Sequence, residues 1–107
     1  MAFHIKQNDT SPAMLATLKD GDGTVIELSG STVRFHMRPI GKTTSTVDTT
    51  ATIHDVDKGQ VSYSWSANDT ANSGMFEAEF QVTNTDGTIE TFPNAGHILV
   101  EITDEIS

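Results

Sequence analysis

Two short runs decide the fold of this chain: VSYSW at residues 61–65 and GMFEAEFQV at residues 74–82. In the first run, large apolar side chains alternate with serine. In the second run, apolar side chains alternate mainly with Glu and Gln. An alternation with a period of two is typical of a β-strand that has one buried and one solvent-exposed face. The two runs hold the only Trp, the only Tyr and two of the five Phe residues, so a core has to be built on them.

Other β-like runs lie on both sides of these two, and turn-forming residues separate them. The sequence predicts strands at residues 3–6, 13–19, 24–28, 32–38, 47–54, 61–65, 76–82, 88–92 and 98–102. The Asp-Gly steps at residues 20–23 and 86–87 predict tight hairpin turns, and residues 93–96 predict a kink. The run at residues 13–19 is predicted to be an edge strand, and no run indicates a helix. A single all-β domain over residues 1–107 follows, either an antiparallel sandwich or a barrel, with about seven to nine short strands.

One short segment bears on the type of sandwich. Residues 72–76, Asn-Ser-Gly-Met-Phe, have the shape of the Asp-x-Gly-x-Tyr segment with which immunoglobulin-like domains enter a late strand. Phe76 stands where that segment has Tyr, and without a hydroxyl it cannot make the corner hydrogen bond. The sequence alone therefore leaves the immunoglobulin-like interpretation open.

The charge of the chain is strongly negative and unevenly distributed. Its formal charge is −9, and residues 43–107 carry eleven acidic residues against Lys58 alone. Nucleic-acid binding usually needs a basic face, so we expect no nucleic acid among the partners. A solvated acidic surface explains the composition, and a high-salt host cytoplasm is an alternative explanation.

Several other classes of protein are not expected. The chain has no cysteine, which excludes a disulfide framework and a thiolate metal site. No apolar run approaches the roughly 20 residues that span a bilayer, so we expect no membrane association. The first residues lack the features of a signal peptide, so we expect the chain to stay in the cytoplasm of its host until lysis.

Candidate catalytic and metal sites are weak. Residues 20–31 begin like a calcium loop, but Val25 and Ser31 stand where that loop has Gly and Glu. The four histidines show no ligand spacing, so we expect no metal and no other cofactor. Glu77 and Glu79 share one strand face at a spacing that a glycosidase could use, but paired carboxylates on an acidic surface favour a solvated face. We therefore expect no enzymatic activity.

Several segments, taken in order, carry a family resemblance. These segments are IKQNDTSP at residues 5–12, VIELSGSTVRFHMR at residues 25–38, GQVSYSW at residues 59–65, DT at residues 69–70, GMFEAEF at residues 74–80, DG at residues 86–87 and TFP at residues 91–93. Together they resemble the N-terminal domain of the baseplate upper protein (BppU) of siphophages, which also occurs in short virion proteins. The resemblance covers nearly the whole chain. It implies an immunoglobulin-like antiparallel β-sandwich that acts as a structural or adaptor module in the particle of a tailed virus.

The resemblance also implies partners and a location. We expect a virion protein that is assembled in the host cytoplasm, binds other virion proteins, and is present as a homo-oligomer or in multiple copies. The chain ends at Ser107, so we expect it to lack the longer region that carries receptor-binding parts in the baseplate protein. A position in the tail, baseplate or fibre-attachment region is expected, and a capsid decoration or turret role is the alternative.

Three surfaces are the candidate protein contacts: the terminal strand with Phe3 and Ile5, the basic strand with Arg34, His36 and Arg38, and the loop with Asn68 and Asp69. An edge strand can pair with a neighbour through its main chain. A carbohydrate-binding module is a further alternative, for which Tyr63 and Trp65 would have to form an exposed platform. Their alternation with Val61 instead predicts that both rings are buried.

Overall fold

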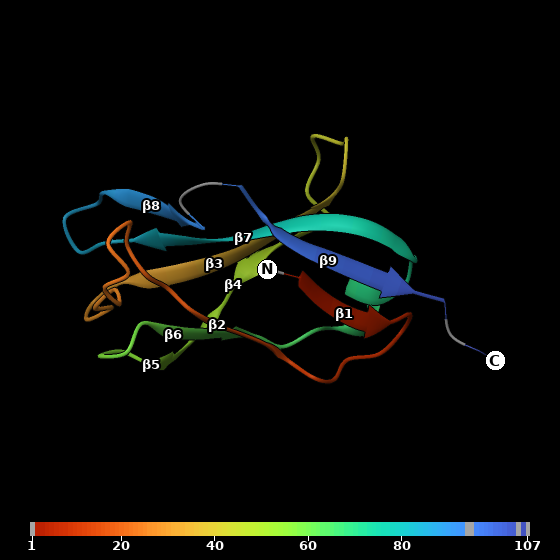
Figure 1. Ribbon diagram of the computed structural model, residues 1–107, viewed down its shortest axis with the longest axis horizontal. Coiled ribbons are helices and arrows are strands. Elements are labelled where there is room, and N and C mark those ends of the chain that lie inside the picture. The colour runs from red at the N-terminus through yellow and green to blue at the C-terminus, as the bar shows by residue number, and fades with distance from the viewer. Residues whose placement is uncertain (1, 94–95, 105, 107) are drawn as a thin grey trace.

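The computed structural model describes residues 2–93, 96–104 and 106, and within them it contains nine strands and one short 3₁₀ helix (Figure 1). The elements, in chain order, are β1 (Ala2–Lys6), β2 (Met14–Thr17), β3 (Thr32–Pro39), β4 (Val47–Thr50), β5 (Thr52–Asp55), β6 (Gln60–Tyr63), η1 (Ala67–Thr70), β7 (Gly74–Thr83), β8 (Ile89–Phe92) and β9 (Ile98–Thr103). No helix among the described residues is long and apolar enough to cross a membrane.

The strands form two open sheets that pack face to face. The six-stranded sheet has the order β1-β9-β7-β3-β4, with β8 paired to β7, and the three-stranded sheet has the order β2-β6-β5. The predicted all-β class and the sandwich are confirmed, and a closed barrel is excluded. The prediction of a purely antiparallel sheet is wrong, because β1 pairs with β9 in parallel. A period-two pattern indicates which face of a strand is buried, but it carries no information on the direction of its neighbour.

Two predicted strands take a different form. The run at residues 47–54 is divided into β4 and β5, which belong to different sheets. The change occurs at the buried Ala51, whose N–H donates to the carbonyl of Val33 at 2.8 Å. The predicted return strand at residues 24–28 is reduced to a single bridge between Lys19 and Val25. The segment still bonds to its neighbours through the N–H of Ile26 to the carbonyl of Leu18 at 2.9 Å and the N–H of Leu28 to the carbonyl of Val56 at 3.1 Å.

Other predictions hold closely. The turn at residues 20–23 is present, and Asp20 accepts hydrogen bonds from the main chain of Asp22 and Thr24 through its carboxylate. The hairpin at Asp86-Gly87 joins β7 to β8. The 3₁₀ helix η1 was not predicted. Of the predicted kink at residues 93–96, residues 94 and 95 lie outside the described residues.

An aromatic cluster joins the two sheets at the centre of the core. Phe35 of β3 stacks on Tyr63 of β6 with ring centroids 4.3 Å apart, and Phe80 of β7 lies 5.2 Å from Phe35. Trp65 meets both Phe35 and Tyr63 edge-on. Tyr63 and Trp65 are only 6% and 4% exposed, which confirms that the two runs quoted first form the interior.

Gly59 occupies a turn position at which main-chain atoms of other segments approach closely. Its φ of +62° is one that residues with a side chain rarely adopt. A Cβ atom added there would lie 2.6 Å from the carbonyl oxygen of Ile26 and 2.9 Å from that of Leu18. Gly87 also has a positive φ, +86°, but an added Cβ would meet nothing within 4 Å.

Alanine substitutions at Gly59 and Gly87 can therefore separate the cost of backbone strain from the cost of close packing. We expect Gly87→Ala to lower the free energy of unfolding by about 1 kcal/mol, because it introduces strain alone. Gly59→Ala should lower it by at least about 2 kcal/mol more, because the main chain of two neighbours has to shift as well. Urea unfolding followed by Trp65 fluorescence measures both values, and equal losses in the two variants would contradict the close approach at Gly59.

Candidate docking surfaces

The outer face of the six-stranded sheet carries a row of ion pairs that we call the charged ladder: Arg34, His36, Arg38, Asp48, Glu77 and Glu79. These side chains face outward because β3 and β7 alternate, with their apolar residues directed into the core. Arg34 donates to Asp48 Oδ1 from Nε at 3.0 Å and from Nη2 at 2.8 Å. His36 Nε2 lies 3.2 Å from the same Oδ1 atom. Asp48 thus offsets the charge of Arg34 at one end of the predicted basic strand.

The second arginine has its own carboxylate. Arg38 donates from Nε to Glu77 Oε1 at 2.7 Å, and His97 Nδ1 lies 3.3 Å from Glu77 Oε2. A shallow groove of about 130 Å³ runs beside these groups, lined chiefly by His36, Arg38, Ser45, Glu77, Glu79 and His97. An acidic neighbour would therefore compete with Asp48 and Glu77 for the two arginines. Across the described residues, no group of three or more His, Asp or Glu side chains could hold a metal ion.

The ladder changes the titration of one carboxyl. The pKa of Asp48 is lowered chiefly by the hydrogen bond from Arg34, while some loss of hydration opposes the shift and the charge of His36 adds to it. A carboxyl whose pKa is lowered by folding stabilises the native state above its unfolded pKa. That contribution is lost as the pH falls through the lowered folded value, below about 4.

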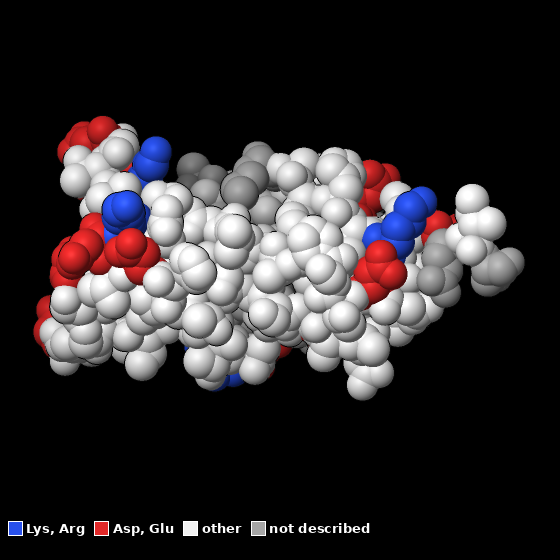
Figure 2. All heavy atoms as spheres, turned by 90° about the horizontal axis from the view of Figure 1, so that it is seen from below, with Lys and Arg blue, Asp and Glu red and all other residues white. Residues whose placement is uncertain are grey.

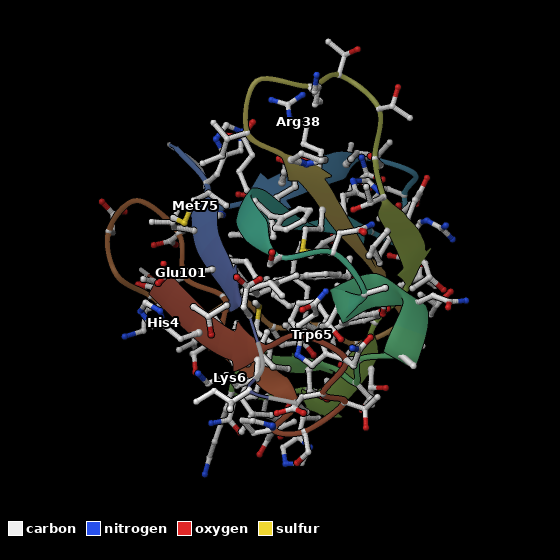
Figure 3. All side chains as sticks on the ribbon, turned by 90° about the vertical axis from the view of Figure 1, so that its right-hand side faces the viewer. His4, Lys6, Arg38, Trp65, Met75 and Glu101 are labelled. Atoms are coloured by element: carbon white, nitrogen blue, oxygen red, sulfur yellow. The ribbon has the colours of Figure 1, made fainter. Side chains whose placement is uncertain are left out.

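The terminal strand turns its candidate residues inward. Ile5 is only 5% exposed, and the half-buried Phe3 stacks on Trp65 with ring centroids 5.7 Å apart. The outward side chains are His4 and Lys6, and His4 Nδ1 lies 2.9 Å from Glu101 Oε1. Figure 3 shows Trp65 between the layers and His4 with Glu101 on the outer side of β1 and β9. A partner that binds at β1 would thus contact the main-chain edge of the strand and the side chains of His4 and Lys6.

The loop with Asn68 and Asp69 forms η1. Asn68 is exposed, whereas Asp69 is half-buried and accepts hydrogen bonds from the Tyr63 hydroxyl at 2.5 Å and from the Ser66 N–H at 2.9 Å. Burial raises the pKa of Tyr63 well above its ordinary range, and the hydrogen bond to Asp69 and its charge add to the rise. Asp69 therefore anchors the loop to β6, and Asn68 is the side chain left at the surface.

One outward apolar side chain escaped the analysis of the sequence. Leu15 of β2 is 62% exposed, although its neighbours Met14 and Leu18 are buried. The run MLATL at residues 14–18 has apolar side chains at both odd and even positions, so its pattern could not show which of them face outward.

The comparison with known families connects this geometry to a function. The family model of the BppU N-terminal domain matches residues 2–93, a range that includes β1 to β8. The chain belongs to this family. The resemblance carried by the ordered motifs is therefore confirmed. No curated protein matches the chain.

Membership of the BppU N-terminal domain family supplies the broad function. BppU is the upper baseplate protein of a phage, a structural protein of the virion tail without enzymatic activity. As part of a baseplate it contacts other virion proteins. The Glu77 and Glu79 carboxylates of this BppU domain therefore belong to a structural surface rather than to a hydrolase, as their ion pairs also indicate.

The two arginines of this BppU domain form a matched pair, because they lie on one strand face and each contacts a different carboxylate. We expect Arg34→Ala to raise the pKa of Asp48 towards its ordinary value, since the main hydrogen bond that lowers it is removed. Arg38→Ala should leave that pKa unchanged, because Arg38 contacts Glu77 instead. NMR titration of the side-chain carboxyl carbons measures both, and a similar rise in the two variants would contradict the separate pairing.

Tyr63 is the single tyrosine of the chain, so an ultraviolet absorbance titration reports on it alone. We expect no phenolate signal near pH 10, where a free tyrosine is half ionised, because burial and Asp69 hold the proton. A pKa raised by folding stabilises the native state fully below the unfolded pKa, and this contribution is lost as the pH rises above about 10. Asp69→Asn removes the neighbouring charge and should lower the pKa of Tyr63. Ionisation of the wild-type Tyr63 at the pH of the free residue would contradict both its burial and its bond to Asp69.

Proposed function

We propose that this BppU-family domain is an adaptor that docks onto other proteins of the tail baseplate in multiple copies. The observation that carries the proposal is the family match over residues 2–93, which takes in most of the sandwich. The sandwich offers broad faces and edges rather than a closed pocket. Its grooves are shallow and open, as expected of a domain that contacts large partners.

We further propose that the contacts involve the three surfaces expected from the sequence. On the six-stranded sheet, the charged ladder around Arg34, His36 and Arg38 would supply orientation and specificity rather than raw affinity, because its charges are already paired. At β1, which contains Phe3 and Ile5, contact would run through the main-chain edge. At η1, contact would involve Asn68, with Asp69 holding the loop in place.

We also propose that the sandwich is immunoglobulin-like. Its order β2-β6-β5 against β9-β7-β3-β4 corresponds to strands B-E-D against G-F-C-C′ of that architecture. Phe35 and Tyr63 occupy the centre of the core, and the bond from Tyr63 to Asp69 takes the place of the corner bond that Phe76 cannot make. Amide contacts in NMR spectra that pair β2 with a strand other than β6 would contradict this assignment.

The two alternative functions, capsid decoration and carbohydrate binding, would require different surface features. A capsid decoration role would use the same faces against another partner. A carbohydrate-binding module needs an exposed aromatic platform. Tyr63 and Trp65 are buried, so neither ring offers such a platform.

Immunogold labelling of purified virions tests the location. We expect antibodies raised against this domain to label the distal end of the tail, and the tagged domain to capture baseplate proteins from disrupted particles. Antibodies against the major capsid protein serve as the control for labelling elsewhere on the particle. Gold on the capsid with none on the tail would replace the proposal with the decoration role.

A further inference from the structure

The edge of the three-stranded sheet differs from the other edges of the sandwich. Native proteins protect an edge strand with charged side chains, proline, bulges or short length, because its free main-chain groups would otherwise recruit another strand. Among the described strands, β1 carries Lys6, β4 carries Asp48, and β8 carries Glu90 and ends beside Pro93. The strand β5 ends at Asp55 with an irregular register. The strand β2 reads Met-Leu-Ala-Thr and pairs with β6 in regular register, so it contains no charge, proline or bulge. Short length does not set it apart, because β4, β5 and β8 also have four residues.

The free main-chain groups of β2 can be assigned to particular residues. Leu18 donates its N–H to the carbonyl of Gly59 at 2.8 Å, so its main chain is directed towards the β6 side, and its own carbonyl accepts a hydrogen bond from the N–H of Ile26 at 2.9 Å. In an antiparallel pair such residues alternate with residues that point away from the partner strand. The N–H and C=O groups of Ala16 therefore point towards β6, while those of Leu15 and Thr17 point to the free edge.

An apolar groove lies directly beside this edge. Its volume is about 370 Å³, and its floor and walls include Ala16 and Leu18 on one side and Phe80, Phe92, Pro93 and Ile98 on the other. In Figure 1, β1 occupies the right-hand part of the molecule, whereas β2 and β8 lie to its left. The chain passes from β1 in one sheet to β2 in the other, so no described strand pairs with the outer side of β2.

The charge around the groove indicates the chemistry of an occupant. Figure 2 shows the face over β2, β6 and β5 almost without Lys, Arg, Asp or Glu in its middle, with charged groups gathered towards its ends. Lys19 and Asp20 line one end of the groove, and Asp22 follows them in the turn. Asp55, Asp57 and Lys58 lie in or beside the hairpin that joins β5 to β6, so acidic groups outnumber basic ones at these ends by four to two. Leu15 extends the uncharged surface outward from the groove and is 62% exposed.

We propose that β2 accepts an extended segment of a neighbouring baseplate protein as a fourth strand of the three-stranded sheet. The segment pairs with the main chain of Leu15 and Thr17, places alternate apolar side chains over Leu18 and Phe92, and carries Lys or Arg where it passes Asp20 and Asp22. The inference rests on the proposed function, because it names the edge through which the adaptor holds its partner. A groove walled by Phe92 and Pro93 of the opposite sheet suits a single strand better than the broad edge of a second copy of the domain.

Two proline variants test the edge in matched positions. Thr17 and Thr50 are both exposed threonines in edge strands. The N–H of Thr50 also points away from its partner strand, because Ala51 donates its N–H to Val33. Thr17→Pro removes a donor and blocks the edge of β2 without breaking a bond to β6, and Thr50→Pro does the same at β4. Leu15→Lys is a second way to protect β2, by adding a charge to its outer face.

The probe is a set of overlapping peptides that cover the baseplate and tail proteins of the same phage, added to the full chain. We expect at least one peptide to bind, and Thr17→Pro and Leu15→Lys to weaken it about tenfold or more, while Thr50→Pro changes it by less than about twofold. Hydrogen exchange should show the amides of Leu15 and Thr17 becoming protected when the peptide binds. The amide of Leu18 should be protected with and without peptide, because it is bonded to Gly59.

Other outcomes would overturn the inference in distinguishable ways. Binding that protects the edge of β1 or β4 and is unaffected by Thr17→Pro would leave the adaptor role intact and remove β2 from it. Protection of Leu15 and Thr17 that rises with protein concentration in the absence of peptide would assign the edge to a second copy. Failure of every peptide to bind, together with failure to capture any intact baseplate protein, would overturn both this inference and the proposed function.

Discussion

The stacking of Phe35 on Tyr63 is the contact on which the two layers of the sandwich depend. Phe35 lies on the central strand pair of the six-stranded sheet, and Tyr63 lies at the end of the middle strand of the other sheet, with ring centroids 4.3 Å apart. Phe80 and Trp65 complete the cluster from the two sides. Offset and edge-to-face rings contribute both buried area and a preferred geometry, so this cluster sets how the sheets face each other.

The same cluster connects the core to the surface. Tyr63 is buried by the cluster, yet its hydroxyl reaches the carboxylate of Asp69 and holds η1 in place. Trp65 brings β1 into the structure by stacking on Phe3. Two of the three surfaces proposed for docking are thus positioned by rings that are themselves inaccessible. The remaining surface, the charged ladder around Arg34, is positioned by the opposite face of the strand that carries Phe35.

The edges of the sandwich differ in the devices that protect their free main-chain groups. Most edges of this sandwich carry the devices that prevent strand addition, such as Asp48 on β4 and Lys6 on β1. The ladder keeps its charges paired within the domain, so the face that carries Arg34 and Arg38 attracts an acidic surface only weakly. The strand β2 departs from this arrangement, and it lies beside an apolar groove. A partner strand that pairs with β2 would leave the other edges of the sandwich unpaired.

The sequence by itself determined the all-β class, most strands, the burial of Tyr63 and Trp65, and membership of the BppU N-terminal domain family. It could do so because period-two alternation and turn residues act locally, and because the ordered motifs extend over most of the chain. It placed Arg34, His36 and Arg38 on one face for the same reason.

Apart from the hairpin of β7 with β8, the tertiary structure alone decided the partners of the strands. Nothing local in β1 shows that it pairs with β9 in parallel, and nothing near Ala51 shows that the chain changes sheets there, because both depend on contacts between distant segments. The ion pairs of Arg34 with Asp48 and of Arg38 with Glu77 likewise come from neighbouring strands. The edge of β2 and its groove exist only once both sheets are assembled, because the two walls of the groove come from different sheets.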